Sequence, residues 1–326
     1  MAAAPGLMRD PRAGADRPRR ERAAAGRNLR HCLSAVVLVP LVAGLLACAG
    51  GTTTDARPLI VATTTVVGDL CAHVAGEAAR VEVLMPTGAD PHDFAPSARQ
   101  AARLRDADLV VASGLGLEAG LADALDAARE EGTPVLELGP ALDPRPLADG
   151  AASPDPHWWL DPVRAAAAVQ LLGERLGRIA PGQWAERAAA YADELATLDA
   201  EIRSILSAIP DDRRTLITSH AAFGYFADRY RLTVVGVLVP GGATQAQSGT
   251  RQLAALAEVI RSRGVRAIFG ETTLSTNVAD ALAAEVGGAV QVVVLYTGSL
   301  GEPGSGADTY AGMLRTDARR IADALA

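Results

Sequence analysis

Residues 183–209 have the sequence QWAERAAAYADELATLDAEIRSILSAI, the longest uninterrupted helical pattern in this chain of 326 residues. Apolar side chains recur there every three or four residues with charged ones between them, which predicts one long amphipathic helix. These apolar positions are Tyr191, Leu195, Leu198, Ile202 and Ile205. On both sides of the segment, short apolar runs alternate with amphipathic ones. The pattern therefore predicts a helix that joins two blocks of strands and helices.

The two blocks contain similar sets of expected strands. Those before the long helix are Leu59–Thr64, Val81–Met85, Leu109–Ser113 and Val135–Leu138, and those after it are Thr215–Thr218, Thr233–Val239, Val265–Phe269 and Val292–Leu295. Continuous apolar strands that alternate with helices are typical of a parallel sheet covered on both faces. We predict an α/β fold of two lobes, each a mostly parallel sheet flanked by helices. A ligand cleft is expected between the lobes, at the carboxyl ends of the strands.

The start of the chain has the pattern of an export signal. An Arg-rich segment over residues 1–30 precedes an apolar run from Leu33 to Ala47, which is too short to cross a bilayer comfortably. The run ends at Cys48, and small residues follow, as in the lipobox of a bacterial lipoprotein. A signal anchor is the alternative, but it would need a longer apolar run. We expect Cys48 to carry a lipid that anchors the protein to the outer face of the cell membrane.

The expected organisation is a signal peptide (1–47), a tether (48–58), an N-terminal lobe (59–182), the linking helix (183–209) and a C-terminal lobe (210–326). In the folded part Cys71 is then the one remaining cysteine, so no internal disulfide is expected. The formal net charge is −7, and loss of the Arg-rich start makes the remainder more acidic. An acidic surface argues against nucleic acid as a partner and is compatible with a cationic ligand.

Three of the five histidines lie in short motifs unlike the sequence around them. The motifs are Gly88-Ala89-Asp90-Pro91-His92-Asp93-Phe94, Asp155-Pro156-His157-Trp158-Trp159-Leu160-Asp161-Pro162 and Thr218-Ser219-His220-Ala221-Ala222-Phe223-Gly224. Imidazole is the commonest metal ligand among side chains, and zinc accepts three of them. No two of these histidines lie within one helical turn, so the fold would have to assemble a shared site. His73 is expected to pack on the first helix and not to bind metal.

The order of these motifs, followed by Phe269-Gly270-Glu271-Thr272 and Tyr296-Thr297-Gly298-Ser299-Leu300-Gly301, resembles the zinc- and manganese-binding lipoproteins of ABC importers. The resemblance runs from about Leu59 to the C-terminus. It implies two (β/α) lobes bridged by a long helix, a metal ion in the cleft, a permease partner in the membrane and a monomeric protein. The His-rich loop of many zinc-binding members is absent, because residues 140–156 contain no histidine.

The resemblance also implies a ligand set. His92 and His157 would be the ligands from the N-terminal lobe and His220 the first from the C-terminal lobe. A third imidazole in place of the Glu found in many manganese-selective members favours Zn²⁺ over Mn²⁺. The family usually has an Asp ligand where this chain has Gly298. We expect Glu271 to compensate as a ligand, with an orienting role for Glu271, or water as the fourth ligand, as the alternatives.

Two other functional classes are compatible with these motifs. Three histidines and an open position are also the pattern of a catalytic zinc site, so a metallohydrolase is the main alternative. The chain has no H-E-x-x-H motif, although Glu271 or Asp93 could serve as a general base. A surface adhesin on the same fold is the third class. We predict a binding protein, not an enzyme.

Overall fold

The computed structural model describes residues 56–147, 153–239, 244, 249–287 and 290–326, which form two four-stranded sheets. The first sheet has the order β2-β1-β3-β4, with β1 Leu59–Ala62, β2 Arg80–Val83, β3 Leu109–Ala112 and β4 Val135–Glu137. The second has the order β6-β5-β7-β8, with β5 Thr215–Thr218, β6 Thr233–Val237, β7 Ala267–Glu271 and β8 Gln291–Leu295. All neighbouring strands are parallel, which confirms the predicted two-lobed α/β fold.

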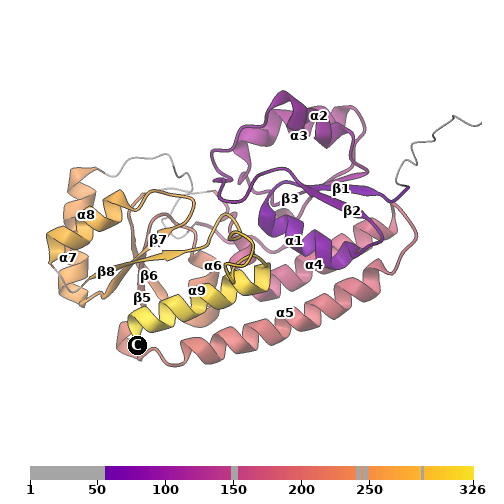
Figure 1. Ribbon diagram of the computed structural model, residues 1–326. Helices are drawn as coiled ribbons and strands as arrows, with labels where there is room; N and C mark the ends of the chain where they lie inside the picture. The colour runs from indigo at the N-terminus through magenta and orange to yellow at the C-terminus, as the bar shows by residue number, and fades with distance from the viewer. Residues whose placement is uncertain (1–55, 148–152, 240–243, 245–248, 288–289) are drawn as a thin grey trace, which may run out of the picture. The chain divides into compact units, whose positions relative to one another are not determined.

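Helices connect the strands within each lobe (Figure 1). In chain order they are α1 Thr65–Ala75, α2 Ala98–Arg105, α3 Ala122–Glu130, α4 Pro162–Gly177, α5 Trp184–Leu206, α6 Gly224–Tyr230, α7 Thr250–Arg263, α8 Asn277–Val286 and α9 Tyr310–Leu325. Short 3-10 turns occupy Ala119–Leu121, Gly139–Ala141, Trp158–Leu160 and Asp211–Arg213. Local signals start several helices: α4 opens on Pro162, and the Asp161 side chain accepts a hydrogen bond from Val163 N.

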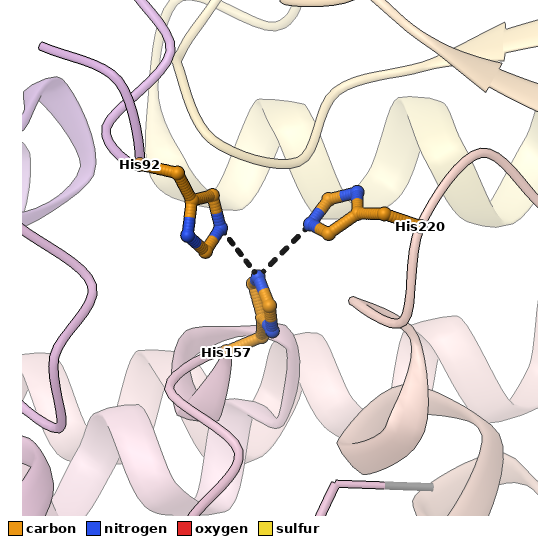
Figure 2. Close-up of side chains that lie close together, drawn as sticks. All are labelled: His92, His157 and His220. Carbon is orange, nitrogen blue, oxygen red and sulfur yellow. Dashed lines mark hydrogen bonds between the residues drawn. The ribbon is translucent and has the colours of Figure 1, made fainter. Parts of the chain in front are cut away.

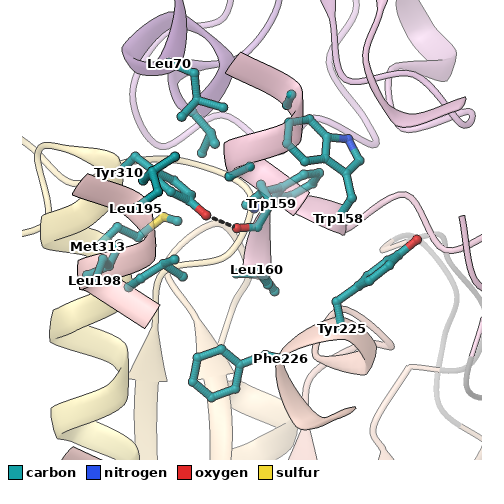
Figure 3. Close-up of a cluster of buried hydrophobic side chains, with 14 of the residues drawn as sticks. Leu70, Trp158, Trp159, Leu160, Leu195, Leu198, Tyr225, Phe226, Tyr310 and Met313 are labelled. Carbon is teal, nitrogen blue, oxygen red and sulfur yellow. Dashed lines mark hydrogen bonds between the residues drawn. The ribbon is translucent and has the colours of Figure 1, made fainter. Parts of the chain in front are cut away.

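Each sheet has helices packed on both faces, and successive strand residues point to opposite faces, so both sets of side chains are buried. In β1, Ile60 and Ala62 join a large core shared with α1, α4, α5 and α9, whereas Leu59 and Val61 pack toward α2 and α3. The second sheet is also buried on both faces. One face contributes to the same large core, and α7 and α8 cover the other. Figure 3 shows part of the large core, where residues of both lobes meet around α5.

The long helix α5 links the two lobes as predicted. Its buried side chains include Tyr191, Leu195, Leu198 and Ile202, and it packs against α1 and α4 of the first lobe and α9 of the second. The helix ends at Leu206, short of the predicted Ile209, because Pro210 follows and the last residues tighten into turns. A single element therefore contributes to the core of both lobes.

All eight predicted strands are present, and most end one or two residues earlier than predicted. One difference affects the site: the strand predicted as Val265–Phe269 is β7, which continues through Glu271. Glu271 is thus a strand residue and not the start of a loop. The predicted signal peptide and Cys48 lie outside the described residues. Among the helices that the structure describes, none is long and apolar enough to cross a membrane.

Candidate metal centre

Three neighbouring strands of the second sheet end at the same edge and bring polar groups together there. His220 follows β5 by two residues, Glu271 is the last residue of β7, and Thr297 follows β8 by two residues. Because β7 lies between β5 and β8, the three side chains meet. Glu271 Oε1 accepts from His220 Nδ1 at 2.6 Å, and Thr297 Oγ1 donates to Glu271 Oε2. The sheet order therefore assembles this half of the site.

The first lobe contributes two histidines from loops. His92 lies in the loop after β2, where its backbone N donates to Asp90 Oδ1 at 3.0 Å. His157 ends the long connection from β4 and precedes the 3-10 turn Trp158–Leu160. Asp155 accepts from the backbone N of His157 at 3.0 Å and from its Nδ1 at 2.8 Å. Both loops direct an imidazole toward His220.

The three imidazoles converge on one point (Figure 2). His157 Nε2 lies 3.1 Å from His92 Nε2 and 3.1 Å from His220 Nε2. All three nitrogens lie within 4.8 Å of one another. Two nitrogens bound to one tetrahedral zinc ion are about 3.3 Å apart, given Zn–N distances of about 2.0–2.1 Å. The two separations of 3.1 Å are close to this value, whereas the third pair, within 4.8 Å, would draw closer around a shared metal ion.

Carboxylates determine which nitrogen of the two buried rings is free to bind. Since Asp155 and Glu271 accept hydrogen bonds, we assign the ring protons of His157 and His220 to Nδ1. Each Nε2 then carries a lone pair, and the two lone pairs face each other across 3.1 Å. That arrangement is repulsive unless a cation or a proton lies between them. The site thus attracts positive charge.

Burial and charge shift the pKa values of the three rings in different directions. Burial, reinforced by the neighbouring imidazoles, lowers the pKa of His92 to about 3 and that of His157 well below 6.5. Burial also opposes a charged His220, but the Glu271 carboxylate outweighs it and raises the pKa of His220. The ion pair in turn lowers the pKa of Glu271 against the effect of burial. His220 is therefore the ring that holds a proton most readily.

The structure brings His92, His157 and His220 together, and it places Glu271 beside His220 at Nδ1 and not among the converging nitrogens. Gly298 lies close to the first lobe: a Cβ at this position would be 2.7 Å from Pro91 Cδ. Sequence reasoning missed the roles of Asp155 and Thr297. The Asp-Pro-His spacing around His157 was a usable signal for Asp155, but Thr297 shows its role only through the strand order.

His73 lies on α1 as predicted, away from the three converging rings. Its ring stacks on Tyr191 of α5 with centroids 4.0 Å apart, and its Nδ1 contacts the backbone O of Asp69 at 2.8 Å. Cys71, on the same helix, is a buried free thiol. Both residues belong to the packing between α1 and its neighbours.

Fold and site together define a two-lobed solute-binding protein with a candidate metal site formed by residues of both lobes. Residues 60–324 match the family described as zinc-uptake complex component A periplasmic, ZnuA. The chain belongs to this family, whose members are the metal-binding components of ABC metal transporters and work with a permease and an ATPase.

Relatives and solved structures agree with this assignment. The manganese-binding lipoprotein MntA of Halalkalibacterium halodurans is 29% identical over 87% of this chain and 95% of its own length. The zinc-binding protein TroA of Treponema pallidum is 30% identical over 83% of this chain and 90% of its own length. The structure of the periplasmic zinc-binding protein TroA superposes with a TM-score of 0.77 at 30% identity, covering 83% of this chain and 99% of TroA.

Proposed function

We propose that this protein captures Zn²⁺ between its lobes and delivers it to the permease of an ABC importer. The observation that carries the proposal is the convergence of three imidazole nitrogens whose ring protons are held away by carboxylates. His92, His157 and His220 are the proposed ligands. The metal is cargo, and the protein's contribution is to bind and release it.

The donor set favours Zn²⁺ over Mn²⁺. Zinc accepts three imidazoles in a tetrahedral site, whereas manganese prefers carboxylate, carbonyl and water oxygens in a larger shell. Among the described residues, the converging group contains three nitrogen donors and no carboxylate oxygen. The relatives are named for either metal, so the donor set is the main argument.

We assign Glu271 an orienting role. Its two oxygens are hydrogen-bonded to His220 and Thr297, and the converging donor group contains the three histidines and not Glu271. Asp155 has the same role for His157. Carboxylates bound to the second ring nitrogen of a ligating histidine fix its tautomer and make it a stronger ligand. A water molecule then completes the coordination of the metal.

The proposal includes the cellular placement expected from the sequence. Cys48 carries the lipid, residues 48–58 form the tether, and a monomer acts outside the cytoplasm. The family description as periplasmic, and the naming of MntA as a lipoprotein, support this placement.

We further propose that the protein has no catalytic activity of its own. In zinc metalloproteases a glutamate beside the metal acts as the general base that activates water. Glu271 is buried in hydrogen bonds that orient His220. Incubation of the metal-loaded protein with ester and phosphate substrates tests this directly: turnover would contradict the proposal.

Competition titrations with a chelating dye test the site itself. We expect one Zn²⁺ per chain, bound more tightly than Mn²⁺, and a large loss of affinity in His220→Ala. His73→Ala is the matched control, because His73 is a histidine outside the centre. Equal losses in the two variants would contradict the assignment of the site.

A further inference from the structure

The four residues Thr297, Gly298, Ser299 and Leu300, here named the TGSL segment, connect β8 toward α9. The segment has no imidazole, thiol or carboxylate, so its side chains offer no strong metal ligand. It nevertheless touches the groups that hold each of the three converging histidines.

The first contact supports His220. Thr297 Oγ1 donates a hydrogen bond to Glu271 Oε2, while Glu271 Oε1 accepts from His220 Nδ1. Thr297 and Glu271 are each 1% exposed, so no water can replace the hydroxyl without rearrangement. The hydroxyl therefore fixes the carboxylate in the orientation that aims His220.

The second contact supports His157 from the other lobe. Trp159 Nε1 donates to the backbone O of Thr297 at 2.8 Å. The Trp159 ring packs edge-on against the His157 ring, with centroids 5.4 Å apart. Trp159 is also held by its backbone O, which accepts from Tyr310 OH at 2.5 Å (Figure 3). The position of the segment thus limits the tilt of the His157 ring.

The third contact supports the loop of His92. Ser299 Oγ accepts a hydrogen bond from the backbone N of Gly88 at 2.8 Å, and Gly298 packs so closely on Pro91 that a Cβ would lie 2.7 Å from Pro91 Cδ. Pro91 directly precedes His92. The His92 loop therefore depends on the opposite lobe for part of its support.

We propose that the TGSL segment positions all three metal-binding histidines and so sets the affinity of a site to which it contributes no ligand. The inference rests on the proposed zinc site. Thr297 acts through Glu271 and Trp159, and Ser299 acts through the His92 loop. The segment belongs to one lobe and supports two histidines of the other, so its effect on zinc affinity depends on contacts between the lobes.

The experiment compares Thr297→Val, Thr297→Ser and Ser299→Ala with the unaltered protein. Zn²⁺ affinity is measured by competition with a chelating dye, and the visible absorption of bound Co²⁺ reports the geometry of the ligands. Thermal unfolding of the metal-free proteins monitors the fold. Thr63→Val is the matched control, because the Thr63 hydroxyl also donates to a buried carboxylate, Glu118 Oε1 at 2.7 Å. The other partners of Glu118 are the backbone N of Ser113 and Gly114, and among the described residues it is hydrogen-bonded to no histidine.

We expect Thr297→Val to weaken zinc binding about 10- to 100-fold, the range typical of groups that orient ligands. Thr297→Ser restores the hydroxyl and should recover most of the affinity. Ser299→Ala should weaken zinc binding and shift the Co²⁺ absorption, whereas Thr63→Val should lower thermal stability and leave zinc affinity unchanged. If Thr297→Val does not fold, Ser299→Ala decides the matter.

Unchanged zinc affinity in Thr297→Val or, where that variant does not fold, in Ser299→Ala would overturn the inference. Equal losses of affinity in Thr297→Val and Thr63→Val would also overturn it, because they would reflect stability alone. A failure of the proposed function looks different: the unaltered protein would not bind zinc, or His220→Ala would bind it as well as the unaltered protein does.

Discussion

At the candidate metal centre, two of the three histidines are each paired with a carboxylate that determines which ring nitrogen can bind a metal ion. Asp155 and Glu271 each bind one ring at Nδ1, which leaves Nε2 of His157 and His220 as the binding atom. Among the described residues, no carboxylate binds Nδ1 of His92, and this ring is also the most exposed of the three. Of the three proposed ligands His92 is therefore the least constrained, and we expect a metal ion to enter or leave beside its loop.

Glu271→Ala tests the orienting role directly. We expect a loss of zinc affinity of about 10- to 100-fold, because His220 keeps its place but loses the partner that fixes its tautomer. Chelator competition on the purified variant measures the change. A much larger loss would indicate that Glu271 ligates the metal itself, and unchanged affinity would remove it from the site.

A side chain at position 298 is expected to weaken binding. The carboxylate of Gly298→Asp would supply the Asp typical of the family, and the backbone is not in the left-handed region, but the new Cβ meets the Pro91 ring at 2.7 Å. Gly298→Ala isolates this steric effect, and we expect it to lower zinc affinity by displacing the His92 loop. Zinc titration of both variants separates the effect of the added carboxylate from the steric effect of the Cβ. Higher affinity in Gly298→Ala would contradict the steric argument.

Zinc affinity should depend on pH through one histidine. An imidazole must be neutral to bind metal, and the low pKa values of His92 and His157 keep both rings neutral in mildly acidic solution. Glu271 raises the pKa of His220, so zinc must displace one proton from His220 once the pH falls below that raised pKa. We expect the logarithm of the affinity to fall by about one unit per pH unit.

Titrations at a series of pH values measure this slope. In Glu271→Gln the pKa of His220 falls, so the pH dependence should move to lower pH. A slope near zero, or one near three, in the mildly acidic range would contradict the assignment of His220 as the proton-binding ligand.

Among the helices and strands, the sequence predicted those features that depend on local patterns of apolar residues. The strands and the long helix were predicted because apolar periodicity depends on neighbouring residues. Contacts such as Thr297 with Glu271 could not be predicted, because they depend on β7 lying next to β8, and a linear pattern does not state strand order. Glu271 was predicted from the sequence as a metal ligand, whereas its hydrogen bond to His220 could be seen only from the pairing of β5 with β7.

Helix α5 should carry a large share of the stability that the lobes have in common. Leu198 is 2% exposed within the core that joins the lobes, so Leu198→Ala leaves a cavity there. We expect a loss of about 2–5 kcal/mol in the free energy of unfolding. Denaturant titration measures it, with Thr197→Ala as an exposed control on the same helix, expected to change stability by less than about 0.5 kcal/mol. Equal effects in the two variants would contradict the packing argument.

For the whole molecule, the two lobes meet at a centre that neither lobe forms alone. Two imidazoles come from the first lobe and one from the second, and the segment after β8 supports both sets. The motifs predicted this division from their order along the chain. They could not reveal that Gly298 and Pro91 are in contact across the lobes, since those residues are far apart in sequence. We therefore expect metal binding to depend on these contacts between the lobes.

The X-ray absorption spectrum at the zinc edge of the metal-loaded protein identifies the atoms that bind the ion. We expect one zinc ion with three imidazole nitrogens at about 2.0–2.1 Å and one oxygen ligand. We also expect a clear loss of imidazole scattering in His157→Ala. A shell of oxygen ligands without imidazole scattering, or a spectrum unchanged in His157→Ala, would contradict a zinc site built from the three histidines.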